Sequence, residues 1–285
     1  MQQDGRDYRA VIARIAPELD VRTIRQTHGQ FNDVVIANEA WVFRFPRSVA
    51  AAATLQREVA ILRALAGRLT LAIPEPAYAS DDPLLPYMGY PLLPGEPLRR
   101  DALATAPDAE LERLARQLAD FLGELHGLPV EVLPDATIHD TRDDWAALFA
   151  GFRDQLFPHM RAEAREQVTR DFSAYLEDPA SAAWMPVIRH GDLGGDNILR
   201  NATSGALTGV IDFASAAIGD PAIDLAALST LGERMLGHLL AAWPAAEALL
   251  ERARFYRGTF ALQEALYGLR DGDEESFESG IARYR

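Results

Sequence analysis

Two short segments constrain this chain more than any others: residues 189–199, with the sequence RHGDLGGDNIL, and residues 210–213, with the sequence VIDF. The first segment places Gly, Asp and Asn between apolar ends, a composition typical of a loop at the edge of a strand. The second is a short apolar strand that ends on a carboxylate. Together they present two carboxylates and one amide, from Asp192, Asn197 and Asp212.

These three side chains suit phosphoryl transfer, which asks little covalent chemistry of a protein and much positioning and charge neutralisation. We expect Asp192 to orient an acceptor hydroxyl as the catalytic base. Asn197 and Asp212 are expected to supply oxygen ligands to Mg²⁺, a hard cation held through few carboxylates and the nucleotide phosphates. Any one of these residues alone is more typical of a turn, so the prediction of a magnesium–nucleotide site rests on all three together.

The same residues carry a family resemblance. The chain resembles the aminoglycoside phosphotransferase family of small-molecule kinases in three places: His190-Gly191-Asp192 with Asn197, residues 211–213, and the run IGDPAIDL at residues 218–225. The resemblance implies an α+β, bilobal protein-kinase-like fold with a small β-rich N-lobe and a larger, mainly helical C-lobe. It also implies transfer of the terminal phosphate of ATP or GTP to a substrate hydroxyl. The motifs are specific for the superfamily and poorly specific for the substrate.

On this resemblance, residues 1–94 form an N-terminal nucleotide-binding lobe with the hinge at its end. Residues 95–285 form a C-terminal catalytic and substrate-binding lobe. A chain of 285 residues with 48% hydrophobic content can bury a core large enough for two such lobes. We expect it to act as a monomer.

Composition excludes several classes of protein. No lysine occurs, which excludes a P-loop kinase because that motif needs its lysine on the phosphates. A net charge of −14 disfavours a nucleic-acid partner and favours a cationic or neutral one, although acidity also serves solubility alone. Without cysteine there is neither a disulfide nor a thiolate metal site. No apolar run approaches the roughly 20 residues of a membrane helix, so we expect a cytoplasmic protein with no membrane partner.

The first lobe shows a helix-like segment at residues 5–16 and three strand-like segments at residues 21–27, 34–37 and 41–45. The loop at residues 28–33 precedes the hairpin, and its Gly29 and Asn32 are candidates for covering the nucleotide phosphates. With a single glycine, a plain turn explains this loop nearly as well.

In the resembling family, the third strand presents a lysine to the phosphates and pairs it with a glutamate on the next helix. Arg44 occupies the corresponding strand position here, and Glu58 lies on the following helix-like segment at residues 48–69. Arginine keeps a permanent charge and a forked donor geometry, so phosphate binding is retained with altered reach. The alternatives are that Arg44 is an ordinary exposed strand residue, or that Arg47 takes the role.

Residues 87–98 are strand-like and run into a connector rich in Pro and Gly. By its order in the chain this segment resembles the inter-lobe hinge, and backbone contacts to the nucleotide base are expected near Leu92 and Leu93. A simple edge strand and turn explains the composition equally well.

The remainder is predicted to be mainly helical. An apolar face at residues 109–126 predicts a core helix ending at His126, which we interpret as a capping or core histidine. His190 is expected to brace the catalytic loop, and Asp220 and Asp224 are expected to fix the loop and start a helix. Further helices are predicted at residues 145–157, 168–176, 225–231, 235–243 and 253–269.

Three functions stay open. The first is a small-molecule kinase acting on an aminoglycoside, with macrolide, choline, homoserine, methylthioribose and fructosamine as other acceptors. The acids Glu264 and Asp271 are candidates for an acidic wall that attracts a cationic acceptor, although such a cluster is often an ordinary solvated surface. The second is a metal-dependent hydrolase, disfavoured because His190 is the only nearby histidine. The third is a catalytically silent nucleotide-binding regulator, against which Asp192 and Asp212 both argue.

Overall fold

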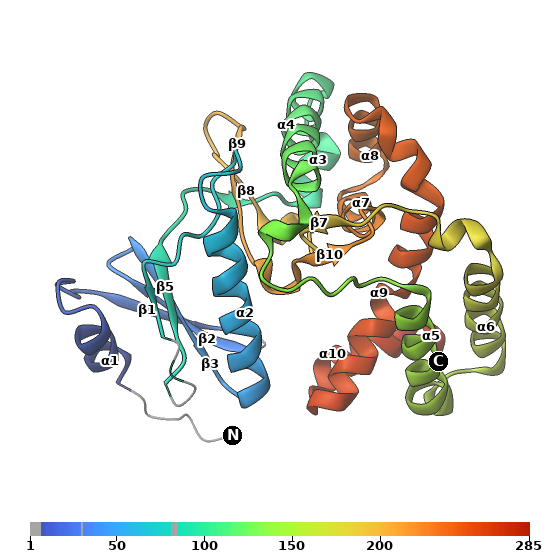
Figure 1. Cartoon of the computed structure of the whole chain (residues 1–285), viewed down its shortest axis with the longest axis horizontal. Coiled ribbons are helices and arrows are strands. Elements are labelled where there is room, and N and C mark those ends of the chain that lie inside the picture. The colour runs from blue at the N-terminus through green and yellow to red at the C-terminus, as the bar shows by residue number, and fades with distance from the viewer. Residues whose placement is uncertain (1–6, 30, 81, 83–84) are drawn as a thin grey trace. The chain divides into compact units, whose positions relative to one another are not determined.

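The computed structural model describes residues 7–29, 31–80, 82 and 85–285 (Figure 1). The expected start of the first helix at residue 5 and the loop residue Gln30 lie outside the described residues. The chain divides into two compact units: Met1–Leu98, Val132–Pro134 and Asp196–Ala216 form the first, and Arg99–Glu131, Asp135–Gly195 and Ala217–Arg285 form the second. Residues 196–216, which contain Asn197 and Asp212, therefore belong to the first unit although they follow residue 94 in the chain.

A five-stranded antiparallel sheet is the centre of the first unit, with strand order β1-β2-β3-β5-β4. The predicted hairpin is confirmed: Asn38, Glu39 and Ala40 join β2 to β3. Asn38 and Glu39 have φ of 54° and 50°, a left-handed conformation common in tight hairpin turns, and the N–H of Ala40 donates to the Ala37 carbonyl at 3.0 Å. The strands are β1 (Ile24–His28), β2 (Asn32–Ala37), β3 (Trp41–Pro46), β4 (Tyr78–Ala79) and β5 (Met88–Pro91).

Two helices cover this sheet, α1 (Tyr8–Ile15) and α2 (Val49–Leu65). Alternation along β3 sends Phe43 and Phe45 into the core shared with α1, while Arg44 points to the opposite face, toward α2. Ser48 caps the start of α2 by accepting the N–H of Ala51. The helix ends close to Gly67, as its sequence predicts.

A second, three-stranded sheet in the first unit carries the magnesium candidates. It consists of β6 (Glu96–Pro97), β8 (Ile198–Arg200) and β9 (Leu207–Val210), in the order β6-β8-β9. Gly209 lies so close to the bridging residue Ala72 that a Cβ there would come within 2.7 Å of its carbonyl oxygen. Asn197 precedes β8 and Asp212 follows β9, so this sheet sets the distance between their backbones.

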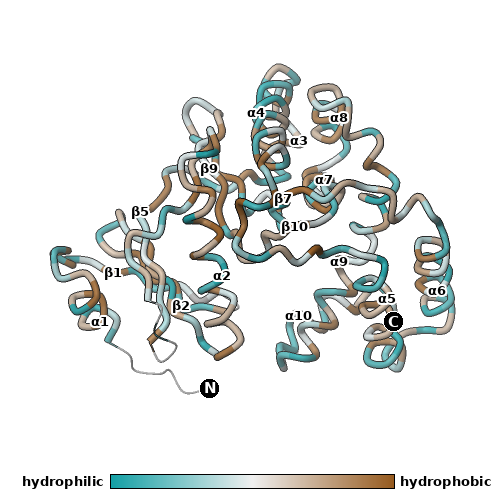
Figure 2. Tube along the Cα trace, viewed as in Figure 1, coloured by the Kyte–Doolittle hydropathy of each residue, from teal (hydrophilic) through white to brown (hydrophobic). Residues whose placement is uncertain are grey.

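The second unit is mainly helical, as predicted, with one pair of short strands, β7 (Val187–Arg189) and β10 (Ala217–Gly219). All seven residues of α7 are buried, which makes it the central helix, and α4 buries one apolar stripe, visible as alternating colours in Figure 2. The helices are α3 (Arg100–Thr105), α4 (Asp108–Gly127), α5 (Arg142–Gly151), α6 (Ala162–Glu177), α7 (Ala222–Leu228), α8 (Glu233–Ala242), α9 (Leu250–Asp271) and α10 (Glu274–Ile281).

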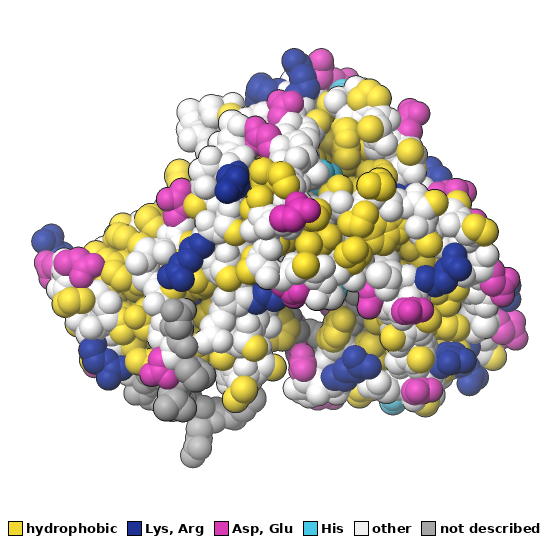
Figure 3. Space-filling model, viewed as in Figure 1, with side chains coloured by type: hydrophobic (Ala, Val, Ile, Leu, Met, Phe, Trp, Pro, Cys, Tyr) yellow, Lys and Arg dark blue, Asp and Glu magenta, His cyan; other side chains and the backbone are white. Residues whose placement is uncertain are grey.

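Several elements differ from the sequence prediction. Helix α5 starts at Arg142, before the expected Trp145, because Thr141 and Asp144 form a reciprocal capping box. Helix α10 was not predicted, and Asp273 caps its start through the N–H of Ser276. Within the described part of the chain, none of the helices has the length and apolar character needed to span a membrane. On the face drawn in Figure 3, Arg side chains are scattered among Asp and Glu.

Candidate active site

Arg44 and Glu58 form a buried ion pair in the first unit. The Arg44 Nη1 to Glu58 Oε1 distance is 2.7 Å, and the two side chains are 12% and 0% exposed. Arg44 is therefore not an ordinary exposed strand residue. The alternative cation, Arg47, is 40% exposed and lies 3.9 Å from Asp33.

Burial raises the pKa of Glu58 to about 7, although the Arg44 charge opposes this by lowering it. Asp212 adds a further raising effect through its own charge. Tyr90 lies in the same cluster, and its burial raises the pKa of the phenol to about 12. The guanidinium of Arg44 thus lies among two carboxylates and one neutral phenol.

Asp212 occupies a strained backbone position, with φ 64° and ψ 70°. Left-handed backbone is uncommon for residues other than glycine and tends to be found at functional sites. Asp212 Oδ1 lies 3.8 Å from Arg44 Nη2, and the Asp212 side chain is 44% exposed. Its neighbour Ile211 donates its N–H to the Asn197 carbonyl at 2.9 Å, which holds the two expected metal ligands side by side.

Asn197 and Asp212 fit a hard cation. They offer only oxygen ligands, and Mg²⁺ is usually held by one or two carboxylates while phosphate and water oxygens complete its shell. No group of three or more His, Cys, Asp or Glu side chains suited to a metal ion occurs in the described part of the chain. This donor set suits a metal that arrives with a nucleotide better than a closed protein site.

In the second unit, a single buried carboxylate holds the loop that carries Asp192. Asp224 accepts the backbone N–H groups of His190, at 3.0 Å, and Gly191, at 2.8 Å. His126 Nε2 lies 2.9 Å from the same carboxylate. The N–H of Asp192 donates to His190 Nδ1 at 3.2 Å, and the Asp192 residue itself is exposed. The predicted bracing role of His190 and loop-fixing role of Asp224 agree with these contacts.

Burial alone would raise the pKa of Asp224. The hydrogen bond and charge of His126, with the N–H of Gly191, outweigh burial and hold the pKa below its usual range. Asp224 is therefore a buried carboxylate that stays ionised. Sequence analysis predicted only a capping or core role for His126, because its partner Asp224 lies 98 residues away in the chain.

Asp220 joins the start of α7 to α9. It accepts the N–H of Ala222 at 2.9 Å, the Tyr256 hydroxyl at 2.8 Å and the Arg252 Nε at 2.6 Å. The predicted structural role of Asp220 agrees with this arrangement, but its partners on α9 were not predicted.

The remaining predicted residues lie as follows. Gly29 donates its N–H to the carbonyl of Asn32, the first residue of β2, at 2.9 Å, which continues the pairing of β1 with β2. The N–H of Leu92 donates to the Ala40 carbonyl at 2.8 Å, and Leu93 is partly exposed. Glu264 and Asp271 are both exposed on α9.

Comparison with known proteins decides the family. The model of the phosphotransferase enzyme family matches residues 22–257. The chain belongs to this family. Viomycin phosphotransferase of Streptomyces vinaceus is 38% identical over 290 residues, covering 98% of each chain. The phosphotransferase also resembles the solved GDP and kanamycin complex of APH(2")-IIia, with 30% identity, a TM-score of 0.89 and coverage of 97% and 96%.

A macrolide 2'-phosphotransferase type I is 25% identical, with a TM-score of 0.80 and coverage of 100% and 99%. The kinase-like fold and the phosphotransferase activity with a hydroxyl acceptor, both implied by the sequence motifs, are thereby confirmed. The phosphotransferase belongs to the antibiotic-modifying kinases that use a nucleotide.

Proposed function

We propose that this phosphotransferase moves the terminal phosphate of a nucleoside triphosphate to a hydroxyl group of an aminoglycoside antibiotic. The observation that carries the proposal is the exposed carboxylate of Asp192, on a loop held by the buried Asp224. Asp192 accepts the proton of the acceptor hydroxyl while the new O–P bond forms and the bond to the nucleoside diphosphate breaks.

The first unit supplies the charges for the donor. Arg44, held by Glu58, neutralises phosphate oxygens, and the bidentate guanidinium geometry suits this role. Asn197 and Asp212 would hold Mg²⁺, whose charge neutralises the β- and γ-phosphates when it is bound. We propose base contacts at the Leu92 carbonyl and Leu93 backbone, and phosphate contacts from the loop of Gly29 and Asn32. The GDP in a relative of 30% identity makes GTP a donor to test beside ATP.

The acceptor is proposed from charge and from the relatives. Glu264 and Asp271 are exposed acids on α9, and an acidic wall raises the encounter rate of a polycation in a way that salt weakens. The kanamycin in the solved relative supports the same class. A second acceptor, viomycin, is favoured by the 38% identity over 98% of both chains to the enzyme named for it.

The test is a phosphate-transfer assay with kanamycin, viomycin and a macrolide, each with Mg²⁺ and either ATP or GTP. We expect kanamycin to be the best acceptor and its KM to rise several-fold between 0.1 M and 1 M salt. Glu264→Gln should raise that KM further than the matched change Glu233→Gln, made at an acid on α8. Faster turnover of viomycin than of kanamycin would show that viomycin is the preferred acceptor. Faster turnover of the macrolide, with no salt dependence, would show that an acidic wall does not select the acceptor. Absence of transfer to all three would overturn the proposal.

A further inference from the structure

A second buried carboxylate lies beside the loop that carries Asp192. Asp140 lies just before α5, and Nε and Nη2 of Arg189 donate to its two oxygens at 2.5 and 2.9 Å. Each of the two side chains is only 10% exposed. Arg189 is the last residue of β7 and directly precedes His190, where the loop begins. A buried ion pair therefore holds the residue from which the loop leaves its strand.

The pair is formed across the short strand β10. The N–H of His139 donates to the Ile218 carbonyl at 2.8 Å, so the segment that leads to Asp140 runs along one edge of β10. Strand β7 pairs with the other edge of β10. Gly219 on β10 lies between the two charged groups, because a Cβ there would come within 2.1 Å of Asp140 Oδ2 and 2.8 Å of Arg189 Nε. The contact therefore depends on a glycine at this position.

Asp140 makes this contact from a strained backbone. Its φ is 63°, in the left-handed region that residues other than glycine uncommonly adopt. Such strain persists where the surrounding structure fixes the residue, and it is concentrated at functional sites. A buried ion pair, for its part, contributes little net stability, because the cost of desolvating both charges offsets their attraction. The strain and the buried charges together favour a role in placing the loop over a role in stability alone.

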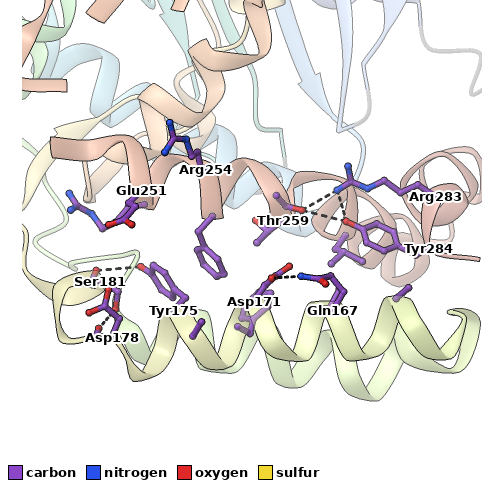
Figure 4. Close-up of a pocket in the computed structure, with 18 of the residues that line it drawn as sticks. Gln167, Asp171, Tyr175, Asp178, Ser181, Glu251, Arg254, Thr259, Arg283 and Tyr284 are labelled. Atoms are coloured by element: carbon purple, nitrogen blue, oxygen red, sulfur yellow. Dashed lines mark hydrogen bonds between the residues drawn. The ribbon is translucent and has the colours of Figure 1, made fainter. Parts of the chain in front are cut away.

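Asp140 is also connected to the helices of the second unit. It accepts the N–H of Asp220 at 3.2 Å. The Asp220 carboxylate accepts the hydroxyl of Tyr256, which lies 2.7 Å from the hydroxyl of Tyr175 on α6. Figure 4 shows this end of the network, where the Tyr175 hydroxyl is directed at Ser181 and both residues line the cavity between α6 and α9. The network joins Asp140 to both helices and so holds its carboxylate in place.

We propose that Arg189 is a positioning residue for phosphoryl transfer, held by Asp140 so that the loop presents the Asp192 carboxylate to the acceptor hydroxyl. The proposal rests on the proposed function, in which Asp192 is the base. Asp224 fixes the main chain of the loop, and Arg189 fixes its first attachment through a side chain. A base acts only within hydrogen-bond reach of its proton, and a misplacement of about 1 Å can cost roughly 10²-fold in rate.

The first experiment combines Arg189→Met with Asp192→Asn, in the full chain, with kanamycin or viomycin as acceptor, whichever is turned over faster. Arg189→Met alone should lower kcat at least tenfold and leave nucleotide binding unchanged, because the loop loses one of its two supports. In the Asp192→Asn background the same change should alter kcat little, since no base is left to misplace. Near-normal kcat in Arg189→Met, or an equal loss in both backgrounds, would overturn the proposal.

The single variant Asp192→Asn separates this inference from the proposed function. Near-normal turnover in Asp192→Asn would show that Asp192 is not the base, and the positioning role of Arg189 would fall with it. A severe loss in Asp192→Asn, together with an equal effect of Arg189→Met in both backgrounds, would overturn the positioning role alone.

A double variant separates positioning from stability. Arg189→Met leaves the Asp140 charge buried without its partner, so the melting temperature should fall. Adding Asp140→Asn removes that charge, keeps an acceptor for the Asp220 N–H and tolerates left-handed backbone. We expect the melting temperature to recover in the double variant while kcat stays at least tenfold below that of the parent protein. Recovery of kcat together with the melting temperature would show that the pair only stabilises the fold, and would overturn the proposal.

Arg234→Met is the matched control. Arg234 lies on α8 in the same unit and pairs with the exposed Asp108 at 2.6 Å. The variant makes the same change of side chain away from the loop, so kcat and nucleotide binding should stay as in the parent protein. A loss of kcat in Arg234→Met equal to that in Arg189→Met would show that the effect is not specific to the loop, and would overturn the proposal.

Discussion

The two parts of the proposed site are fixed by different forces. In the first unit, Arg44, Glu58 and Asp212 are positioned by attraction between buried or half-buried charges. In the second unit, the loop of Asp192 is positioned by backbone N–H groups that share the buried Asp224. The first arrangement depends on which side chains carry charge, and the second depends on one buried acceptor for the main chain of the loop. A change of charge at Arg44, Glu58 or Asp212 should therefore affect the other two residues, whereas the loop of Asp192 should respond most to a change of Asp224.

The largest effect is expected at Asp212. Asp212→Ala should abolish magnesium-dependent nucleotide binding and activity, because it removes a carboxylate from both the metal and Arg44. Asp212→Asn tests the same point with a residue that tolerates left-handed backbone better than Ala. Calorimetry with nucleotide, with and without Mg²⁺, measures the loss. Glu75→Ala, at an exposed acid of the same unit, is the control. Unchanged magnesium dependence in an Asp212 variant would show that Asp212 is not a magnesium ligand.

Asp192→Asn should lower kcat by roughly 10²–10⁴-fold with nucleotide binding nearly intact, since a general base acts mainly in the transition state. Asp196→Asn is the matched control on the same loop region, and its kcat should change little. Near-normal turnover in Asp192→Asn on a verified acceptor would show that the base lies elsewhere.

Asp224→Asn should lower both the stability of the protein and its turnover, because Asp224 holds the loop that carries Asp192. An amide cannot accept both N–H groups and pair with His126, and a buried donor left without a partner costs about 1–3 kcal/mol. We expect a loss of about 2–4 kcal/mol in the free energy of unfolding, together with a lower kcat, measured by denaturation and steady-state kinetics. Asp108→Asn breaks an exposed pair with Arg234 and should change neither quantity appreciably. Full stability in Asp224→Asn would mean that the loop has another support.

The smallest effect is a pH dependence at Glu58. Its pKa is raised from 4.5 to about 7 in the folded protein, so the folded state binds more protons than the unfolded state between these values. Stability from this group therefore falls as pH rises from about 4.5 to about 7. From pH 4.5 to pH 7, the free energy of unfolding of the parent protein should fall by up to about 3 kcal/mol relative to that of Glu58→Gln, which cannot titrate at this position. A shift of the opposite sign would show that the Arg44 charge outweighs burial.

Local patterns predicted much of this molecule. Helix α4 and the hairpin of β2 and β3 follow from apolar periodicity and turn residues, and the pairing of Arg44 with Glu58 follows from the family resemblance. Short strands such as β7 and β10 were missed because three residues carry too little periodicity to distinguish them from loops.

The candidate site was predicted less completely than the fold. The roles of His190 and Asp220 were predicted, but the partners His126 for Asp224 and Tyr256 for Asp220 were not. These contacts join residues 98 and 36 positions apart, and no local pattern records such a pairing. The catalytic, metal and acceptor roles themselves stay predictions until the variants above are measured.

The arginine on β3 also affects how this enzyme can be inhibited. A reagent that mimics a nucleotide and acylates an ε-amino group needs a lysine beside the phosphates, and this chain contains none. The guanidinium of Arg44 keeps its proton at any working pH and is a poor nucleophile toward such reagents. Covalent inhibitors designed for the lysine of related kinases would have no point of attachment on this strand, so a resistance enzyme of this kind calls for reversible or arginine-directed chemistry.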